Sequence, residues 1–435
     1  MHRVLIASFV LLWASSGRAG VLRVPEDFAS VLAAVDAAAS GDSVLIAPGT
    51  WSERETRTVS INGFSNGRRS SAFLKSNVTL IGTAGAAMTV LQGDPEAPSV
   101  GNDILTYPDS PGGVVRIVGL TLRGAGTRYS GLLGTGSGTV ILNDCVIEGN
   151  GQGVDVNRAN LSMFDTTVRN QDGSLIGISG IKATSVDLVL DGCTFESNTG
   201  GRVVFCQDVG GNSRATVQSC RFVDNEGGKV LFLNGQDPVV VQDNWFEGNI
   251  VPGNITGFCL TVAGSKGSVE RNTFVNNEQF DAGAGVLAVI GSADLGSVNI
   301  VSNTISGTLT PPGSAAAGVV LLSSSAHEFY SNIVAGCRGG PAVFLGSGQF
   351  NPTDGCNVLW DNDSGNFDTY TPQPTDVTAD PQFCNAAAGD FTVSSQSPCV
   401  AGGVPGCGLI GAWDVGCGGV SVEPASWGRI KGMYR

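Results

Sequence analysis

The stretch Leu188-Val-Leu-Asp-Gly-Cys-Thr-Phe195 decides the fold, because its pattern returns along most of the chain. It reappears as Ala215-Thr-Val-Gln-Ser-Cys-Arg-Phe222 and as Val239-Val-Val-Gln-Asp-Asn-Trp-Phe246. Each copy is an alternating apolar strand, a small polar pair, and an apolar residue that we call the anchor. A step of about 26 residues between anchors is typical of solenoid proteins. Strong and weak copies together place the anchors at Leu122, Ile147, Val168, Phe195, Phe222, Phe246, Phe274, Ile305, Val334 and Val358.

A second apolar run lies between successive copies of the pattern. Examples are Gly201-Arg-Val-Val-Phe-Cys206 and Gly228-Lys-Val-Leu-Phe-Leu233. Short strands that alternate with tight Gly, Asn and Asp turns, without intervening helices, indicate one coil of a parallel β-helix. A single coil cannot bury its own apolar face, whereas stacked coils form one continuous core. An antiparallel β-sandwich is the alternative, but it does not predict a fixed repeat.

The composition agrees with a long, turn-rich β protein. Of 435 residues, 63 are Gly, while only 14% are charged and 42% are hydrophobic. The apolar content argues against a disordered chain, and the absence of a three-residue Gly period argues against collagen. The net charge of −14 argues against nucleic acid or an anionic membrane as a partner, because both attract basic surfaces.

The position two residues before the anchor is Asn or Cys in eight of the ten copies of the pattern. On stacked coils this position is a buried turn, where Asn amides can hydrogen-bond along the stack and small Cys side chains fit. We therefore expect a structural role. The members of the column are Cys145, Cys193, Cys220, Asn244, Asn272, Asn303, Asn332 and Cys356.

The front of the chain carries a resemblance to a known superfamily. Residues 25–39 show apolar side chains at helical spacing, with acidic residues in the first turn. Gly41-Asp-Ser-Val-Leu-Ile-Ala-Pro-Gly-Thr-Trp-Ser-Glu53 follows. This helix and strand resemble the opening of pectin-lyase-like right-handed β-helix proteins. The resemblance implies an all-β, right-handed parallel β-helix of about 11–12 coils over residues 20–380, with an N-terminal capping helix. That superfamily contains lyases, hydrolases, esterases and adhesins, so its fold does not define a function.

Residues 381–420 are rich in cysteine and look like the closing segment of exported bacterial β-helix proteins. Four of the eleven cysteines lie here: Cys384, Cys399, Cys407 and Cys417. They suggest two disulfides, and Cys384–Cys399 with Cys407–Cys417 is the simplest of three pairings. Residues 421–435 form a basic, aromatic tail that is either a sorting segment or a frayed terminus.

Residues 1–19 predict a secretory signal, with Arg3, a short apolar run and small residues at the end. No later run is long and apolar enough to predict a membrane span. We expect a secreted, periplasmic or cell-surface protein, and a monomer.

One constellation of charged residues suggests chemistry. Asp155, Lys182 and Asp208 lie 13 or 14 residues before successive anchors, which predicts that they stack on one outward face. Arg158 and Arg202 are nearby in the repeat. Elimination from a uronic-acid polymer needs a base, which could be Lys182 or one of these arginines, and a cation that neutralises the carboxylate. The aspartates could hold Ca²⁺ as that cation; the alternative is a salt-bridged charge ladder.

Two further motifs give weaker indications. Asp361, Asp363 and Asp368 have the oxygen ligands of a calcium loop, but Pro372 replaces the acidic twelfth residue of an EF-hand. His327 has no Gly-x-Ser-x-Gly partner that would predict a hydrolase, so we expect it to be structural or exposed. The sequence thus favours binding, and allows processing, of a polysaccharide along the solenoid. The alternative is a non-catalytic scaffold or adhesin-like protein.

Overall fold

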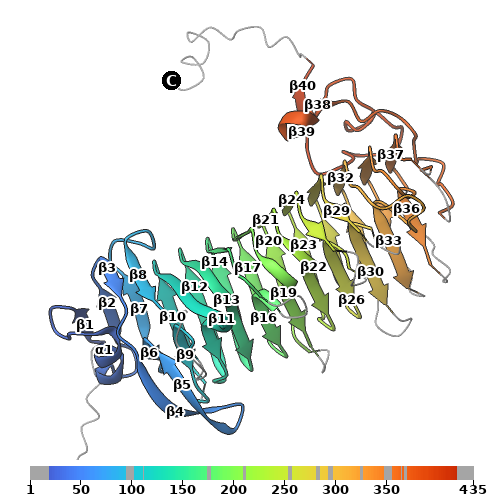
Figure 1. The fold of residues 1–435 in the computed structure, drawn as a ribbon. Coiled ribbons are helices and arrows are strands. Elements are labelled where there is room, and N and C mark those ends of the chain that lie inside the picture. The colour runs from blue at the N-terminus through green and yellow to red at the C-terminus, as the bar shows by residue number, and fades with distance from the viewer. Residues whose placement is uncertain are drawn as a thin grey trace, which may run out of the picture.

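We describe a computed structural model of the chain, which is a three-sheet parallel β-solenoid (Figure 1). The structure describes residues 19–94, 102–110, 112–173, 178–208, 212–252, 257–280, 285–291, 297–323, 327–346, 355–363, 365–366 and 370–418. The predicted signal at 1–19 (except for its last residue) and the tail at 421–435 lie outside these residues. No helix in the described ranges is long and apolar enough to cross a membrane.

The first sheet holds the strands that precede the anchors. Within the described residues it has 12 parallel strands, ordered along the axis. These are β1 (Val21–Val24), β2 (Ser43–Ile46), β7 (Thr79–Gly82), β10 (Val114–Val118), β12 (Gly138–Asn143), β14 (Ala159–Phe164), β17 (Leu188–Asp191), β20 (Ala215–Gln218), β23 (Val239–Gln242), β27 (Gly267–Glu270), β31 (Val298–Val301) and β34 (Phe329–Tyr330).

The second sheet holds the anchors, each in the middle of a short strand or strand segment. Its strands are β3 (Gly49–Trp51), β8 (Thr89–Gln92), the first parts of β11 (Thr121–Gly134) and β13 (Val146–Asn157), β15 (Thr167–Arg169), β18 (Thr194–Glu196), β21 (Arg221–Val223), β24 (Trp245–Glu247), β28 (Thr273–Val275), β32 (Thr304–Ser306), β35 (Ile333–Ala335) and β37 (Val358–Trp360).

The third sheet closes each coil. It contains β6 (Ala72–Phe73), β9 (Leu105–Tyr107), the last parts of β11 and β13, β16 (Ile178–Thr184), β19 (Thr199–Gln207), β22 (Glu226–Asn234), β26 (Leu260–Ala263), β30 (Leu287–Gly291), β33 (Val319–Ser323) and β36 (Val343–Leu345), with β25 (Ile250–Val251) and β29 (Glu278–Gln279) at its margin. Strands β11 and β13 run without interruption from the second sheet into the third.

The anchors form the predicted internal column. Register pairs Leu122 with Ile147 and continues through every predicted anchor to Val334. Four phenylalanines of this column stack face to face, with centroids 4.6–4.8 Å apart. The prediction is wrong at the last anchor, because Val334 pairs with Leu359 rather than Val358. Val358 faces outward and is buried by a later part of the chain.

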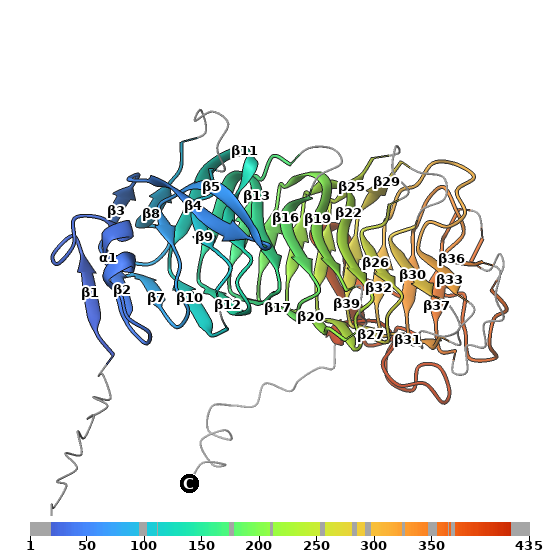
Figure 2. The same cartoon turned by 90° about the horizontal axis from the view of Figure 1, so that it is seen from below.

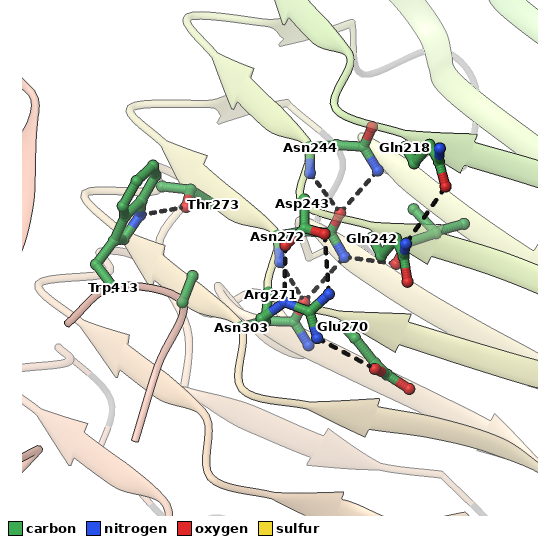
Figure 3. A network of polar contacts seen from close by, with 12 residues as sticks. Gln218, Gln242, Asp243, Asn244, Glu270, Arg271, Asn272, Thr273, Asn303 and Trp413 are labelled. Atoms are coloured by element: carbon green, nitrogen blue, oxygen red, sulfur yellow. Dashed lines mark hydrogen bonds and ion pairs between the residues drawn. The ribbon is translucent and has the colours of Figure 1, made fainter. Parts of the chain in front are cut away.

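The predicted Asn column is confirmed as a hydrogen-bonded ladder (Figure 3). The Oδ1 atom of Asn272 accepts hydrogen bonds from the backbone N and from Nδ2 of Asn244, at 3.1 and 2.9 Å. Asn303 and Asn332 continue the same contacts. The ladder then reaches Asn357, not the predicted Cys356, because of the one-residue shift of the last anchor. A second ladder three residues after the anchor runs through Asn198, Asn225, Asn249 and Asn277.

The N-terminal cap is shorter than the sequence predicts. Helix α1 spans Val31–Ala37, not 25–39, because Ser30 caps it by accepting a hydrogen bond from Ala33 N at 3.1 Å. A hairpin of β4 (Glu55–Ile61) and β5 (Phe64–Ser70) projects beside it (Figure 2). The Asp109 carboxylate holds the turn of the hairpin through Ser60 Oγ and the backbone N of Asn62 and Gly63.

Residues 378–418, which we call the C-terminal segment, fold back along the second sheet rather than extending the solenoid (Figure 1). The segment contains β38 (Phe383–Asn385), the 3₁₀ helix η1 (Ala386–Ala388), β39 (Asp390–Ser394) and β40 (Val415–Cys417). Its apolar side chains cover Ile333 and Val358. The backbone N of Gly411 donates to Ser331 O, and Trp413 packs edge-on against Trp245.

The predicted disulfide pairing is wrong. In the described residues the bridges are Cys356–Cys407 and Cys384–Cys417, each with Cα atoms 5.8 Å apart. The first links the last coil to the C-terminal segment, since the segment returns past Cys356. Cys399 keeps its thiol and is buried in the apolar cluster beneath the segment.

Candidate functional site

The outward face of the third sheet brings together part of the predicted constellation. Register places Asp155 beside Lys182, and Lys182 beside Phe205. The Nζ atom of Lys182 lies 3.0 Å from Asp155 Oδ2, and the two side chains are 38% and 19% exposed. Stacking of these two residues on successive coils is therefore as predicted. They form an ion pair that remains accessible to solvent.

Asp208 does not join this pair, so its predicted place in the stack is wrong. Phe205 occupies that position, and Asp208 follows the end of β19. The Oδ2 atom of Asp208 accepts 2.7 Å hydrogen bonds from the backbone N of Asn212 and of Ser213. Asp208 therefore organises the connection to the next strand. Counting back from the anchors failed here because the connection from β19 to the next anchor is longer than the connection from β16 to its next anchor.

The two predicted arginines have different positions. Arg158 is exposed in a left-handed turn after β13, at φ 77°, and is outside the sheet. Arg202 lies on β19, paired in register with Lys229 on β22. Only Arg202 therefore belongs to the outward face that holds Lys182.

Two phenylalanines complete this face. Phe205 and Phe232 stack with centroids 5.4 Å apart and ring planes within 6°. The guanidinium carbon of Arg202 lies 4.8 Å from the Phe205 centroid, and Lys229 Nζ lies 4.2 Å from the Phe232 centroid. Burial, reinforced by the nearby Arg202 charge, lowers the pKa of Lys229. We call Asp155, Lys182, Arg202, Phe205, Lys229 and Phe232 the third-sheet patch.

Sequence reasoning missed Phe205, Lys229 and Phe232, although a signal was present. The runs Gly201-Arg-Val-Val-Phe-Cys206 and Gly228-Lys-Val-Leu-Phe-Leu233 each carry a basic residue second and Phe fifth. Side chains alternate along a regular strand, so two residues that are three apart point to opposite faces. These basic and Phe side chains share one face only because the backbone bends between them. That bend is visible in the structure, where both Val203 and Val204 are fully buried.

A buried carboxyl group lies at the N-terminal side of the patch. Asp103 Oδ1 accepts a 3.0 Å hydrogen bond from Ser130 N, and Oδ2 lies 3.2 Å from Arg68 Nη1 on the hairpin. Arg54 also donates to the backbone O of Asp103. Burial raises the pKa of Asp103 against the opposing effects of the Ser130 bond and Arg68, and the Asp155 charge raises it further. Asp103 is therefore electrostatically linked to the patch.

The patch is bounded at both ends along the solenoid axis. Toward the N-terminus the same outward column contains Thr106 and Leu133, which are buried. Thr106 Oγ1 is hydrogen-bonded to Ser70 Oγ of β5 at 2.6 Å. Toward the C-terminus the column becomes Ala288 and Val320, buried in a small apolar cluster with Phe258. The charged side chains of this column and two of its aromatic rings thus lie between Asp155 and Phe232.

Two of the three predicted calcium ligands lie in the described residues, and both are paired with one arginine. Asp361 Oδ2 and Asp363 Oδ1 lie 2.7 and 3.5 Å from Arg338 nitrogens, so one guanidinium neutralises both. Asp368 lies outside the described residues. In those residues, no group of three His, Cys, Asp or Glu side chains is arranged to hold a metal ion.

Comparison with known proteins identifies the fold. Residues 130–305 match a family described as "Right handed beta helix region". No curated protein matches the sequence.

Solved structures with similarity to the chain include three enzymes. The A-module of mannuronan C-5 epimerase AlgE4 from Azotobacter vinelandii is 14% identical over 78% of this chain and 91% of its own, with a TM-score of 0.36. The catalytic unit of a GH87 α-1,3-glucanase from Streptomyces thermodiastaticus strain HF3-3 is 16% identical over 79% and 67%, with a TM-score of 0.33. The PL6 family alginate lyase AlyGC is 13% identical over 84% and 54%, with a TM-score of 0.34.

Proposed function

The chain is a right-handed parallel β-helix protein, and we propose that it binds an acidic polysaccharide on the third-sheet patch. The observation that carries this proposal is the pairing of Arg202 and Lys229 with the stacked rings of Phe205 and Phe232. Guanidinium and ammonium groups bind carboxylates. Aromatic rings supply rigid apolar surface for the C–H face of a sugar.

The spacing of the patch supports a polymeric ligand. Equivalent side chains on neighbouring coils repeat at the distance between parallel strands, about 4.8 Å. A chain of sugars lying along the solenoid axis therefore meets a cation and a ring on each of two successive coils. Lys182 adds a third cation on the coil before them, although Asp155 already neutralises part of its charge.

Binding is tested on immobilised polysaccharides. Polygalacturonate and alginate serve as acidic polymers, and dextran and amylose as neutral ones. We expect saturable binding to at least one acidic polymer, weakened by added salt because the exposed charges are screened. Equal binding to neutral and acidic polymers, or no binding to any of them, would contradict the proposal and favour a scaffold role.

Polysaccharide processing is a second candidate, supported by the solvent-accessible ion pair of Lys182 with Asp155. An amine and a carboxylate side by side are groups that can transfer a proton at a sugar carbon. Release of unsaturated or reducing ends by the wild-type protein, and its loss in Lys182→Gln, would support processing. Binding without any product would leave a binding protein.

We also propose that the protein functions outside the cytoplasm. Two disulfides in the described residues support an oxidising compartment. The predicted signal at residues 1–19 provides the route. Fractionation of cells producing the full chain, with N-terminal sequencing of the exported form, tests this; an intact N-terminus on a cytoplasmic protein would contradict it.

A further inference from the structure

A cavity of about 240 Å³ opens on another side of the solenoid, at the turn from the second sheet to the third. It is an open depression lined by Gln92, Arg123, Gly124, Glu148, Gly149 and Asn170. The cavity and the third-sheet patch share β13: Glu148 lies near the start of the strand, and Asp155 near its end. The two surfaces are therefore separate sites that adjoin where the coil of β13 passes from the second sheet to the third.

Two of the lining residues are glycines at one turn position, two residues after the anchor. Gly124 and Gly149 have φ values of 78° and 61°, and Asn170 adopts φ 51° at this position on the next coil. A Cβ atom built on Gly149 meets nothing within 4 Å. The space above Gly149 is thus left by a missing side chain.

The charges around the cavity favour an anion. Arg169 donates hydrogen bonds from Nε and Nη2 to Glu148 Oε2, at 2.9 and 2.8 Å. Arg123 Nη1 lies 3.7 Å from Glu148 Oε1. Two guanidinium groups therefore share one carboxylate. Arg123 Nε donates to Gln92 Oε1 at 2.6 Å, which fixes the side chain. The Nη1 contact with Glu148 is longer than a hydrogen bond, and the Arg123 side chain is 43% exposed, so its guanidinium group can also contact an anion.

The remaining groups suit hydroxyls. Asn170 and Gln92 line the cavity with side-chain amides, and Glu148 lines it with a carboxylate. The volume is below the ~300–1,000 Å³ typical of drug-sized ligands, so it suits one small ring. We propose that this cavity binds a single carboxylate-bearing sugar, with the carboxylate on Arg123 and the hydroxyls on the amide groups. This site does not depend on the function proposed for the third-sheet patch.

The test is calorimetric titration of the full chain with glucuronate, glucose and acetate at low ionic strength. We expect glucuronate to bind at least tenfold more tightly than glucose or acetate, since charge-assisted hydrogen bonds and hydroxyl contacts are then combined. Equal binding of acetate and glucuronate would show a non-specific carboxylate contact and overturn the proposal. The absence of saturable glucuronate binding would also overturn it.

Variants locate the binding. Arg123→Gln is expected to weaken glucuronate binding by about tenfold or more. Glu148→Gln is expected to strengthen it, because the two guanidinium groups lose their shared carboxylate; weaker binding would show that the anion does not sit on Arg123. These two opposite shifts distinguish an anion site from general destabilisation.

Gly149→Asn provides the steric test, since Asn already occupies this left-handed turn at position 170. The new side chain should fill the cavity and abolish glucuronate binding. The matched control is Gly336→Asn, at the same turn position on a distant coil, with φ 66° and room for a Cβ atom. Retained binding in Gly149→Asn would overturn the assignment. Replacing Arg202 and Lys229 should leave the component of glucuronate binding that Arg123→Gln removes in place, which separates this site from the polymer-binding patch.

Discussion

The indole Nε1 of Trp413 donates a 2.7 Å hydrogen bond to Oγ1 of Thr273, a residue 140 positions earlier in the chain (Figure 3). The adjacent backbone N of Ala412 donates to Thr304 Oγ1 at 3.0 Å. The C-terminal segment is therefore held in register with individual coils of the second sheet. Its position depends on specific polar contacts as well as on the apolar cluster around Ile333.

A double-mutant cycle of Trp413→Phe and Thr273→Val measures this contact. Each single change should lower the free energy of unfolding, and the coupling between them should be about 0.5–1.5 kcal/mol, the net value of a hydrogen bond. Hydrogen exchange of residues 411–417 should accelerate equally in either variant. Strictly additive effects would show that the two side chains do not interact.

The disulfide connectivity gives a second prediction. Non-reducing peptide mapping should recover Cys356 linked to Cys407 and Cys384 linked to Cys417. Replacing Cys356 and Cys407 together by Ser should cost about 2–5 kcal/mol, because the bridge closes a long loop. Recovery of a Cys384–Cys399 peptide would contradict the observed path of the C-terminal segment.

The Asn ladder should dominate the stability of the turns it occupies. Asn272 is fully buried and also donates from Nδ2 to Val241 O at 2.9 Å and to Asn303 Oδ1 at 3.0 Å. Asn272→Ala leaves several buried polar groups unpaired, at about 1–3 kcal/mol each.

Asn272→Cys should cost less than Asn272→Ala in urea unfolding, because Cys occupies this column on earlier coils. There the Cys193 thiol donates weakly to Met163 O at 3.4 Å. Equal losses for the two variants would show that hydrogen bonding contributes nothing at this position. Asn66→Ala, on the exposed hairpin, is the control and should be nearly neutral.

How far the sequence predicts this structure depends on the range of the interactions. The spacing of Phe195, Phe222 and Phe246 reports contacts between neighbouring coils, so the solenoid, the anchor column and one Asn ladder could be predicted. The same logic brought Asp155 and Lys182 together. It failed for Asp208, because the connection to the next anchor is longer after β19 than after β16, so that Phe205 takes the position beside Lys182.

Contacts between residues that are many coils apart produce no periodic pattern in the sequence. Nothing in the pattern around Cys407 indicates that it returns to Cys356, or that Trp413 reaches Thr273. The second Asn ladder, through Asn198 and Asn225, could have been predicted from the sequence, because its members lie three residues after each anchor. The position of Lys229 beside Phe232 required the bend of the strand, which periodicity does not encode.

His327 provides a pH-dependent prediction. It is 1% exposed, and its Nδ1 accepts a 2.9 Å hydrogen bond from Val298 N. Burial lowers the pKa of His327. The unfolded chain therefore binds a proton more readily than the folded chain, so stability is complete above about pH 6.5 and falls as the pH decreases below it.

The slope should be at most about 1.4 kcal/mol per pH unit for this one group. His327→Asn keeps an acceptor for Val298 N but cannot titrate, so the difference in unfolding free energy between wild type and variant should shrink as the pH falls from 7 to 5. A difference that stays constant over this range would show that the imidazole is not buried in its neutral form.

The central claim is that the third-sheet patch binds an acidic polysaccharide, and one affinity comparison tests it directly. The variant Arg202→Gln/Lys229→Gln removes both cations beside the stacked rings. Its control, Lys266→Gln with Arg271→Gln, removes the same number of charges from two other exposed ion pairs. We predict that the patch variant loses at least tenfold in affinity for the acidic polymer that the wild type binds, while the control changes less than twofold. Equal affinities for the patch variant and the wild type would contradict the proposed function.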